Sequence, residues 1–389
     1  MRTLRTLACC LVGLGVIGGC SARVSGLPGD GTADGDVGGS LGRGCGSGGG
    51  GAEGGPADLF PCDSPWYRDV SGAPVAPVSA HLMTALAARG FGPDIGGDLH
   101  RLQVNFSYTL LHANASAPKR PVEVMDWPTQ SDLLLQPKQG FPVPTPPGGV
   151  TQGMTDYTCP RDSSDCHTVV VDDERHLLYE LYASSLVGGI WKVSQETVWN
   201  LAWHYPASGR GLSCTSADAA GLAISPGIIG LREMLTAAKT RNADLHHALR
   251  FILPNNRIAA AWVAPGTHLT TGYLHPTNGI PFGTRLRLRA DFDENQVLTP
   301  GGKVLVRTLK RYGMILADGG NIAFTAESEH TYRAKDASLT WNGTLGARDL
   351  EAIPVRAFDV VDWDPSTFHL DEAADRCVVS PAPLSGVLQ

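Results

Sequence analysis

The chain has 389 residues, of which 42% are hydrophobic and 18% are charged, and its formal net charge is −7. This length allows one large domain or two ordinary ones, and the acidic balance provides no electrostatic basis for binding nucleic acid. The 47 glycines and 27 prolines disfavour a helical bundle or a coiled coil.

Residues 1–19 have the pattern of a bacterial signal peptide. Arg2 and Arg5 form a positive start, and the uncharged, mostly apolar stretch 7–19 is too short to span a bilayer. Small residues before Cys20 resemble a lipobox, so we expect Cys20 to be acylated; an ordinary cleaved signal peptide is the alternative. Ser21, in place of the Asp that often retains such proteins at the inner membrane, favours the outer membrane. We therefore predict an extracytoplasmic lipoprotein of the cell envelope.

Residues 20–56 are expected to be a lipid-anchored tether. Glycine occupies nearly every second position from residue 26, and such a segment cannot bury enough apolar surface to offset the entropy of ordering it. A glycine loop that cradles phosphate is disfavoured, because no strand precedes it and no GK[ST] sequence ends it.

Residues 57–389 are expected to form a single β-rich globular domain. Apolar and polar residues alternate with a period of two in 102–108 and in the cationic segment 285–292, and 167–172 with 177–182 predicts a hairpin. Helical periods are fewer and lie at 80–89, 226–240 and 302–312, whereas 142–149, rich in Pro and Gly, predicts a loop. The sequence thus predicts an all-β dominated fold, a β-sandwich or jelly roll with a few short helices, and we expect a monomer.

Five cysteines fall in the predicted domain and indicate an oxidising compartment. Cys159 and Cys166 flank a polar loop, which favours a local disulfide over a metal site because the spacing is not CxxC. The pairing of Cys62, Cys214 and Cys377 stays open.

Several common catalytic motifs are absent from the sequence. It contains no GxSxG elbow, no HExxH helix and no P-loop, so the usual serine esterases, zincin proteases and nucleotide hydrolases are disfavoured. Mechanisms that use carboxylates or histidines on a β scaffold remain.

Two carboxylates stand out by their surroundings. Glu180 alternates with Tyr179 and Leu181 in a predicted strand, where an unpaired carboxylate is costly, so it needs partners or a wet cleft. Asp218 lies among Ala and Gly residues that leave room for a ligand, although an N-cap or an Asx turn explains it equally well.

Two histidines and a third carboxylate complete the candidate group. His247 belongs to a predicted strand, where a lone histidine is more often structural than catalytic, and His268 lies in a long loop rich in Gly and Thr. Asp172 is expected to position a histidine or to hold the hairpin turn. We predict no cofactor, and binding of a divalent metal by these side chains stays open.

Six ordered segments carry a resemblance, namely 178–182, 215–221, 247–251, 265–268, 281–288 and 311–318. Over roughly 142–361 the chain resembles a group of large secreted proteins of soil bacteria and fungi. It departs from them where Gly319 and Gly320 follow Asp318 in place of Asn-Gly, and where a Trp-Asp-rich run is missing after Phe324. The resemblance implies a secreted β-rich protein and groups Asp172, Glu180, Asp218, His247 and His268 as one constellation.

Two classes of function compete. The first is a polysaccharide-active glycoside hydrolase or lyase, with Glu180 as a protonated acid, Asp218 as its ionised partner and a histidine as the alternative base. The second is a non-catalytic surface module that binds a glycan or a protein. Aromatic residues suit both classes, although we expect more than half of them to pack in the core; they are Trp191, Trp199, Trp203, Tyr205, Trp262 and Tyr273.

Overall fold

The computed structural model describes residues 55–92, 102–135, 138–160, 165–270, 278–321, 323–370 and 384. The chain divides into two compact units, Met1–Gly39 and Ser40–Gln389, and every described residue belongs to the second. The predicted signal peptide, Cys20 and nearly all of the predicted tether lie outside the described residues. Within the described ranges, no helix has both the length and the apolar character that crossing a bilayer requires.

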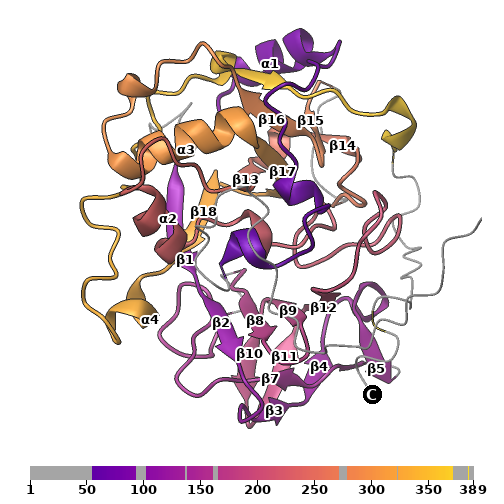
Figure 1. The fold of residues 1–389 in the computed structure, drawn as a ribbon. Coiled ribbons are helices and arrows are strands. Elements are labelled where there is room, and N and C mark those ends of the chain that lie inside the picture. The colour runs from indigo at the N-terminus through magenta and orange to yellow at the C-terminus, as the bar shows by residue number, and fades with distance from the viewer. Residues whose placement is uncertain are drawn as a thin grey trace, which may run out of the picture. The chain divides into compact units, whose positions relative to one another are not determined.

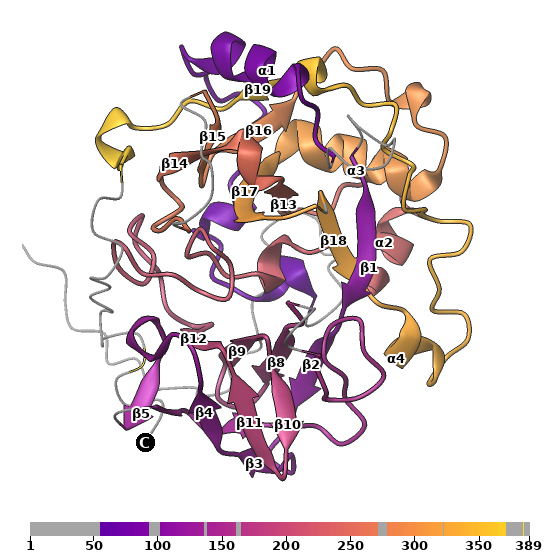
Figure 2. The same cartoon turned by 180° about the vertical axis from the view of Figure 1, so that it is seen from behind.

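The second unit is rich in strands and carries only short helices (Figures 1 and 2), which confirms the mostly-β class. Its largest sheet has six strands in the order β1-β18-β13-β17-β16-β19. These are β1 (Val104–Tyr108), β18 (Phe324–Glu327), β13 (Leu249–Leu253), β17 (Met314–Gly319), β16 (Arg285–Leu288) and β19 (Phe358–Val360). Parallel pairs, such as β1 with β18 and β13 with β17, occur beside antiparallel ones, and the sandwich or jelly-roll arrangement stays a prediction.

A four-stranded sheet of order β12-β9-β8-β2 separates two hydrophobic cores. It consists of β12 (Gln195–Asn200), β9 (Leu177–Tyr182), β8 (Thr168–Asp172) and β2 (Leu110–Ala113), and the antiparallel pairing of β8 with β9 confirms the predicted hairpin. Leu178 faces the core shared with the six-stranded sheet, whereas Tyr179 and Leu181 face the second core. Because successive strand residues point to opposite faces, Glu180 faces the same side as Leu178.

The second core is covered by a five-stranded sheet, seen in the lower part of Figure 1. Its order is β10-β11-β4-β6-β5, with β10 (Ser185–Val187), β11 (Ile190–Val193), β4 (Val122–Val124), β6 (Gln139–Gly140) and β5 (Leu133–Leu135). Two further pairs join β14 (Ile258–Trp262) to β15 (Ile280–Phe282) and β3 (Lys119–Arg120) to β7 (Val143–Pro144), so part of the predicted 142–149 loop forms a two-residue strand.

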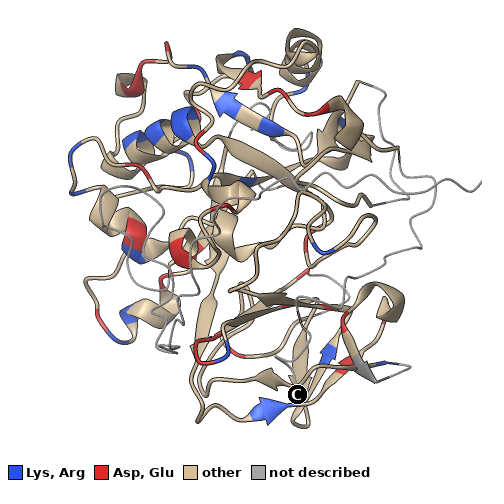
Figure 3. Cartoon of the chain, turned by 45° about the vertical axis from the view of Figure 1, so that its right-hand side comes forward, with Lys and Arg blue, Asp and Glu red and all other residues tan. Residues whose placement is uncertain are grey.

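Three of the four helices of the described residues adjoin the six-stranded sheet: α1 (Ser79–Ala87), α2 (Leu231–Ala237) and α3 (Pro300–Arg311), whereas α4 (His330–Arg333) is a single turn. The prediction of a helix at 302–312 is confirmed by α3, which Thr299 caps by accepting from the Gly302 N–H. Val304, Leu305 and Leu309 form its buried stripe, and the blue segments of this helix in Figure 3 mark its basic residues.

The predicted helix at 226–240 is too long at its start. A 3₁₀ turn covers Ser225–Gly227, Ile229 forms a parallel bridge with Ala326 on β18, and α2 begins only at Leu231. Pro226 and Gly227 favour a turn, and sheet pairing then holds residue 229 in extended conformation.

The cationic face of β16 holds the segment that precedes α1. The Arg287 guanidinium donates to the carbonyls of Val70, Ser71 and Ala73 at 2.6 to 3.1 Å. Arg285 donates to the carbonyls of Pro65, Arg68 and Tyr312, and its burial lowers its pKa to about 9. These two arginines therefore fix the segment 65–73 against the sheet through its backbone carbonyls.

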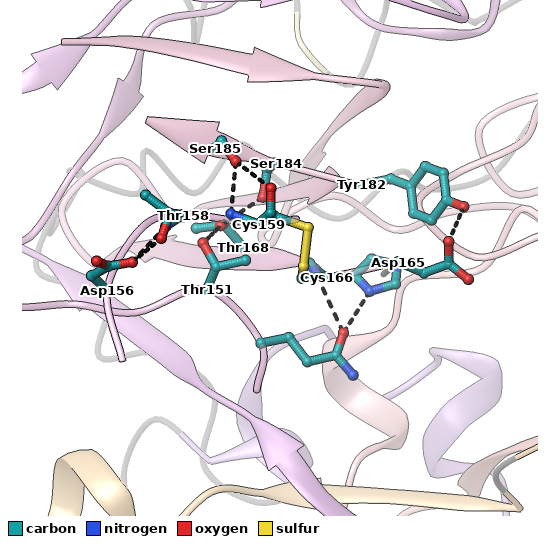
Figure 4. The surroundings of a disulfide bond; sticks show 12 residues. Thr151, Asp156, Thr158, Cys159, Asp165, Cys166, Thr168, Tyr182, Ser184 and Ser185 are labelled. Carbon is teal, nitrogen blue, oxygen red and sulfur yellow. Dashed lines mark hydrogen bonds between the residues drawn. A yellow bond between two sulfur atoms is a disulfide. The ribbon is translucent and has the colours of Figure 1, made fainter. Parts of the chain in front are cut away.

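The predicted Cys159–Cys166 disulfide is present, with 5.9 Å between the two Cα atoms (Figure 4). The Ser185 hydroxyl accepts from the Cys159 N–H at 2.7 Å and donates to the Cys159 carbonyl. Cys62 and Cys214 are also disulfide-bonded.

Candidate functional site

A buried arginine lies at the centre of the candidate site. Arg250 is on β13, between β18 and β17, and its guanidinium binds Asp218 in bidentate fashion through Nε, at 2.8 Å, and Nη2. Its Nη1 donates to the Thr325 hydroxyl on β18 at 2.6 Å, and Nη2 lies 3.6 Å from the Asp318 carboxylate on β17. Two carboxylates from distant parts of the chain therefore contact the same nitrogen of one arginine.

The small residues around Asp218 allow its loop to pack tightly against β17. The Ala220 N–H donates to the Ala317 carbonyl, and the Thr267 N–H donates to the Ala220 carbonyl at 2.8 Å. A Cβ atom at Gly221 would come within 2.2 Å of the Thr267 hydroxyl, so a glycine is needed there. The space that these small residues leave is filled by neighbouring backbone, and the Asp218 side chain binds Arg250 and forms neither an N-cap nor an Asx turn.

Asp318 is the most accessible acid of the group. Its side chain is 25% exposed at the end of β17, whereas Asp218 and Arg250 are fully buried. Burial and the nearby negative charge of Asp218 raise the pKa of Asp318 to about 8, although Arg250 and the N–H groups of Gly319 and Ala219 lower it. The Asp318 carboxyl is therefore protonated more readily than a solvated aspartate, whereas Asp218 shares two hydrogen bonds with Arg250.

His268 lies against the same loop. Its ring Nδ1 is 2.8 Å from the Ala219 carbonyl, so in the neutral ring the Nδ1–H donates to that oxygen and the lone pair is on Nε2. The N–H of the same residue, Ala219, bonds to Asp318. Ala219 thus contacts both the His268 ring and the Asp318 carboxyl.

Tyr108 is a further neighbour of the cluster. Its side chain is buried at the end of β1, and its hydroxyl has no hydrogen-bond partner among the described residues. Burial, together with the charges of Asp218, Glu180 and Asp318, raises its pKa well above the usual range, so the phenol stays protonated.

Glu180 is a fully buried acceptor inside the fold. One carboxylate oxygen accepts from the Ile224 N–H, the Ser225 N–H and the Ser225 hydroxyl at 2.9 to 3.0 Å, and the other accepts from the Trp199 indole at 3.1 Å. Burial raises its pKa to about 7, partly offset by the bonds from Ser225. Of the two environments expected for Glu180, the structure therefore provides partners and no exposure to solvent.

Asp172 and His247 lie apart from the Arg250 cluster. Asp172 accepts from the Arg175 N–H at 3.1 Å and so holds the turn of the β8–β9 hairpin, one of its two expected roles. His247, just before β13, contacts Glu233 on α2 at 3.1 Å and the Ala248 carbonyl at 2.9 Å. Burial lowers the pKa of His247, but Glu233 outweighs this effect and raises it.

Most of the aromatic residues proposed for sugar stacking are in the core. Trp191, Trp199 and Trp262 are buried, Tyr205 is half-buried, and only Trp203, at 38%, is exposed. Tyr273 lies outside the described residues. Three of the six named residues are therefore in the core, and the half-buried Tyr205 packs against it.

Sequence reasoning did not select Arg250 or Asp318 as site residues. The available signals were an arginine inside the apolar strand 249–253 and an aspartate directly after the apolar run 314–317. No group of three or more His, Cys, Asp or Glu side chains in the described ranges is arranged to hold a metal ion.

Comparisons with known proteins add no assignment to this geometry. No protein-family model, no curated protein and no solved structure matches the chain.

Proposed function

We propose that this chain is an extracytoplasmic enzyme that cleaves polysaccharide, as a hydrolase or a lyase, with Asp318 as the acid and His268 as the base. The observation that carries the proposal is the pair of unlike carboxyls on Arg250. Asp218 is buried and ion-paired, whereas Asp318 is partly exposed with its pKa raised to about 8. Two titratable groups with pKa values pushed apart are typical of acid–base catalysis.

The roles follow from what each group can donate or accept. Protonated Asp318 can give its proton to the oxygen of the departing sugar, the step that breaks a glycosidic bond most often requires. We assign the imidazole of His268 as the base that accepts a proton from water or from a sugar carbon. Asp218 and Arg250 hold this pair in place, and Glu180 supports the loop at 224–225 from inside the fold.

The test is product analysis on soluble polysaccharides. A hydrolase releases new reducing ends and no absorbance near 232 nm. A lyase releases new reducing ends together with that absorbance, because elimination leaves an unsaturated sugar that absorbs there. Either result supports the proposal. Tight binding of a glycan without any new reducing end would favour the non-catalytic binding module.

We also propose that the protein is anchored to the outer membrane by a lipid on Cys20. Small residues precede Cys20, and a glycine-rich segment long enough to separate the domain from the membrane follows it. Cys20→Ser should move the protein from the membrane fraction to the soluble fraction in cell fractionation. Unchanged retention of that variant would refute lipidation at this position.

A further inference from the structure

The described residues form a cleft of about 940 Å³, within the volume range of sites that hold small ligands, and its lining includes none of Asp218, Arg250, His268 and Asp318. We name it the Trp363 cleft. Its walls carry the half-buried rings of Trp363 and Tyr205 and the exposed side chain of Arg68, and Pro265 and Gly283 contribute backbone to its surface. The walls come from five separate parts of the chain, 62–74, 205–207, 263–265, 283–285 and 361–367.

Chain geometry places this cleft close to the proposed acid and base. Pro265 is three residues from His268, so their Cα atoms are at most about 11 Å apart. On the other side, the Gly283 N–H donates to the Leu316 carbonyl at 2.8 Å, and Leu316 is two residues from Asp318, a step of about 7 Å. A chain of two or three sugar rings bridges such distances.

The chemistry of the walls suits a carbohydrate. Trp363 and Tyr205 contribute half-buried aromatic rings against which the apolar face of a sugar can pack. Carboxylates of Asp362 and Asp364, with the guanidinium of Arg68, accept from and donate to sugar hydroxyls.

The charge of the cleft walls favours binding of a neutral glycan over binding of an acidic one. The cleft is lined by three carboxylates, Asp63, Asp362 and Asp364, and by two guanidinium groups, so its carboxylates exceed its arginines by one. Negative walls repel the carboxylates of a uronic acid polymer, so a neutral chain is favoured. Elimination by a lyase needs a carboxylate next to the carbon that loses its proton, and a neutral chain has none.

We infer that the Trp363 cleft binds a neutral glycan chain and that the reaction is hydrolysis, an inference that rests on the proposed function. The water oxygen bonds to the anomeric carbon as the bond from that carbon to the departing oxygen breaks. His268 takes the proton of the water and Asp318 gives its proton to the departing oxygen. Proton exchange with solvent then restores both groups.

Affinity electrophoresis of the full mature chain tests the cleft, with galactomannan, mixed-linkage β-glucan and xylan as neutral probes and polygalacturonate as the acidic probe. At least one neutral polymer should retard the wild type and polygalacturonate should not. Trp363→Ala should weaken that retardation about tenfold, the loss expected for one stacked aromatic ring. Trp127→Ala is the matched control, because Trp127 is 45% exposed and lies outside the Trp363 cleft.

Asp362→Lys provides a second variant at an exposed position, in case Trp363→Ala does not fold. It should weaken retardation by the neutral polymer and introduce retardation by polygalacturonate. Equal retardation of wild type and both variants, an equal loss in Trp127→Ala, or retardation of the wild type by polygalacturonate alone would each overturn the inference. Asp318→Asn should still be retarded by the neutral polymer, because Asp318 does not line the cleft. Retardation of a wild type that cleaves none of the polymers would refute the proposed function and leave the assignment of the cleft intact.

Discussion

Replacing Asp318 by Asn should reduce turnover on a cleaved polysaccharide at least a hundredfold, the usual range for loss of an acid or base. Asparagine keeps the size of the side chain but has no proton to transfer, and its amide can still accept from the N–H of Gly319. The reducing-end assay at pH 7 measures the effect. Asp291→Asn is the control, because Asp291 is an exposed aspartate that pairs with an arginine on the surface. Full activity in Asp318→Asn would remove Asp318 from the mechanism.

The pH dependence of the wild type gives a second measurement of the same role. The pKa of Asp318 is raised to about 8, so its acid form predominates below that value and is lost as the pH rises through it. Turnover should therefore fall about tenfold per pH unit above roughly pH 8. In Asp318→Asn this alkaline limb should disappear from the residual activity. A residual activity with the same alkaline limb would assign the limb to another group.

Replacing Asp218 by Asn should destabilise the folded chain by about 3 kcal/mol, because it leaves the buried Arg250 without its main ion-pair partner. Glu180→Gln should also destabilise it, by about 1–3 kcal/mol. A Gln amide replaces one acceptor oxygen with an NH₂ group that faces N–H donors. Urea unfolding followed by tryptophan fluorescence measures both changes. The exposed Asp291→Asn variant should keep the wild-type midpoint.

A loss of stability in Glu180→Gln and Asp218→Asn would indicate a structural role for these two carboxylates. If their role were purely catalytic, turnover would fall and the free energy of unfolding would not change. Comparable losses of stability in both variants mark a buried hydrogen-bond network around Arg250 and the 224–225 turn. An unchanged midpoint in both variants would contradict the structural role. The activity per folded molecule then separates positioning from catalysis, because Asp318→Asn should lose far more activity than Glu180→Gln.

Local pattern was sufficient for several elements of this fold. The runs 167–172 and 177–182, joined by a polar turn, predicted the β8–β9 hairpin, and the apolar stripe of 302–312 predicted α3. The polar loop between Cys159 and Cys166 was short enough for its disulfide to be predicted. In each case the interacting residues are close in the sequence, so spacing alone constrains their geometry.

The candidate site was decided by tertiary structure. Asp218, Arg250 and Asp318 come from a loop, β13 and β17, and only the order of strands in the six-stranded sheet places two carboxylates on one guanidinium. The alternation of apolar and polar residues predicted which face of β9 carries Glu180. It did not predict whether water or protein groups donate hydrogen bonds to the carboxylate, because either kind of donor stabilises it. The residues at 224–225 supply those partners, 44 and 45 positions further along the chain, and no local pattern records a contact of that range.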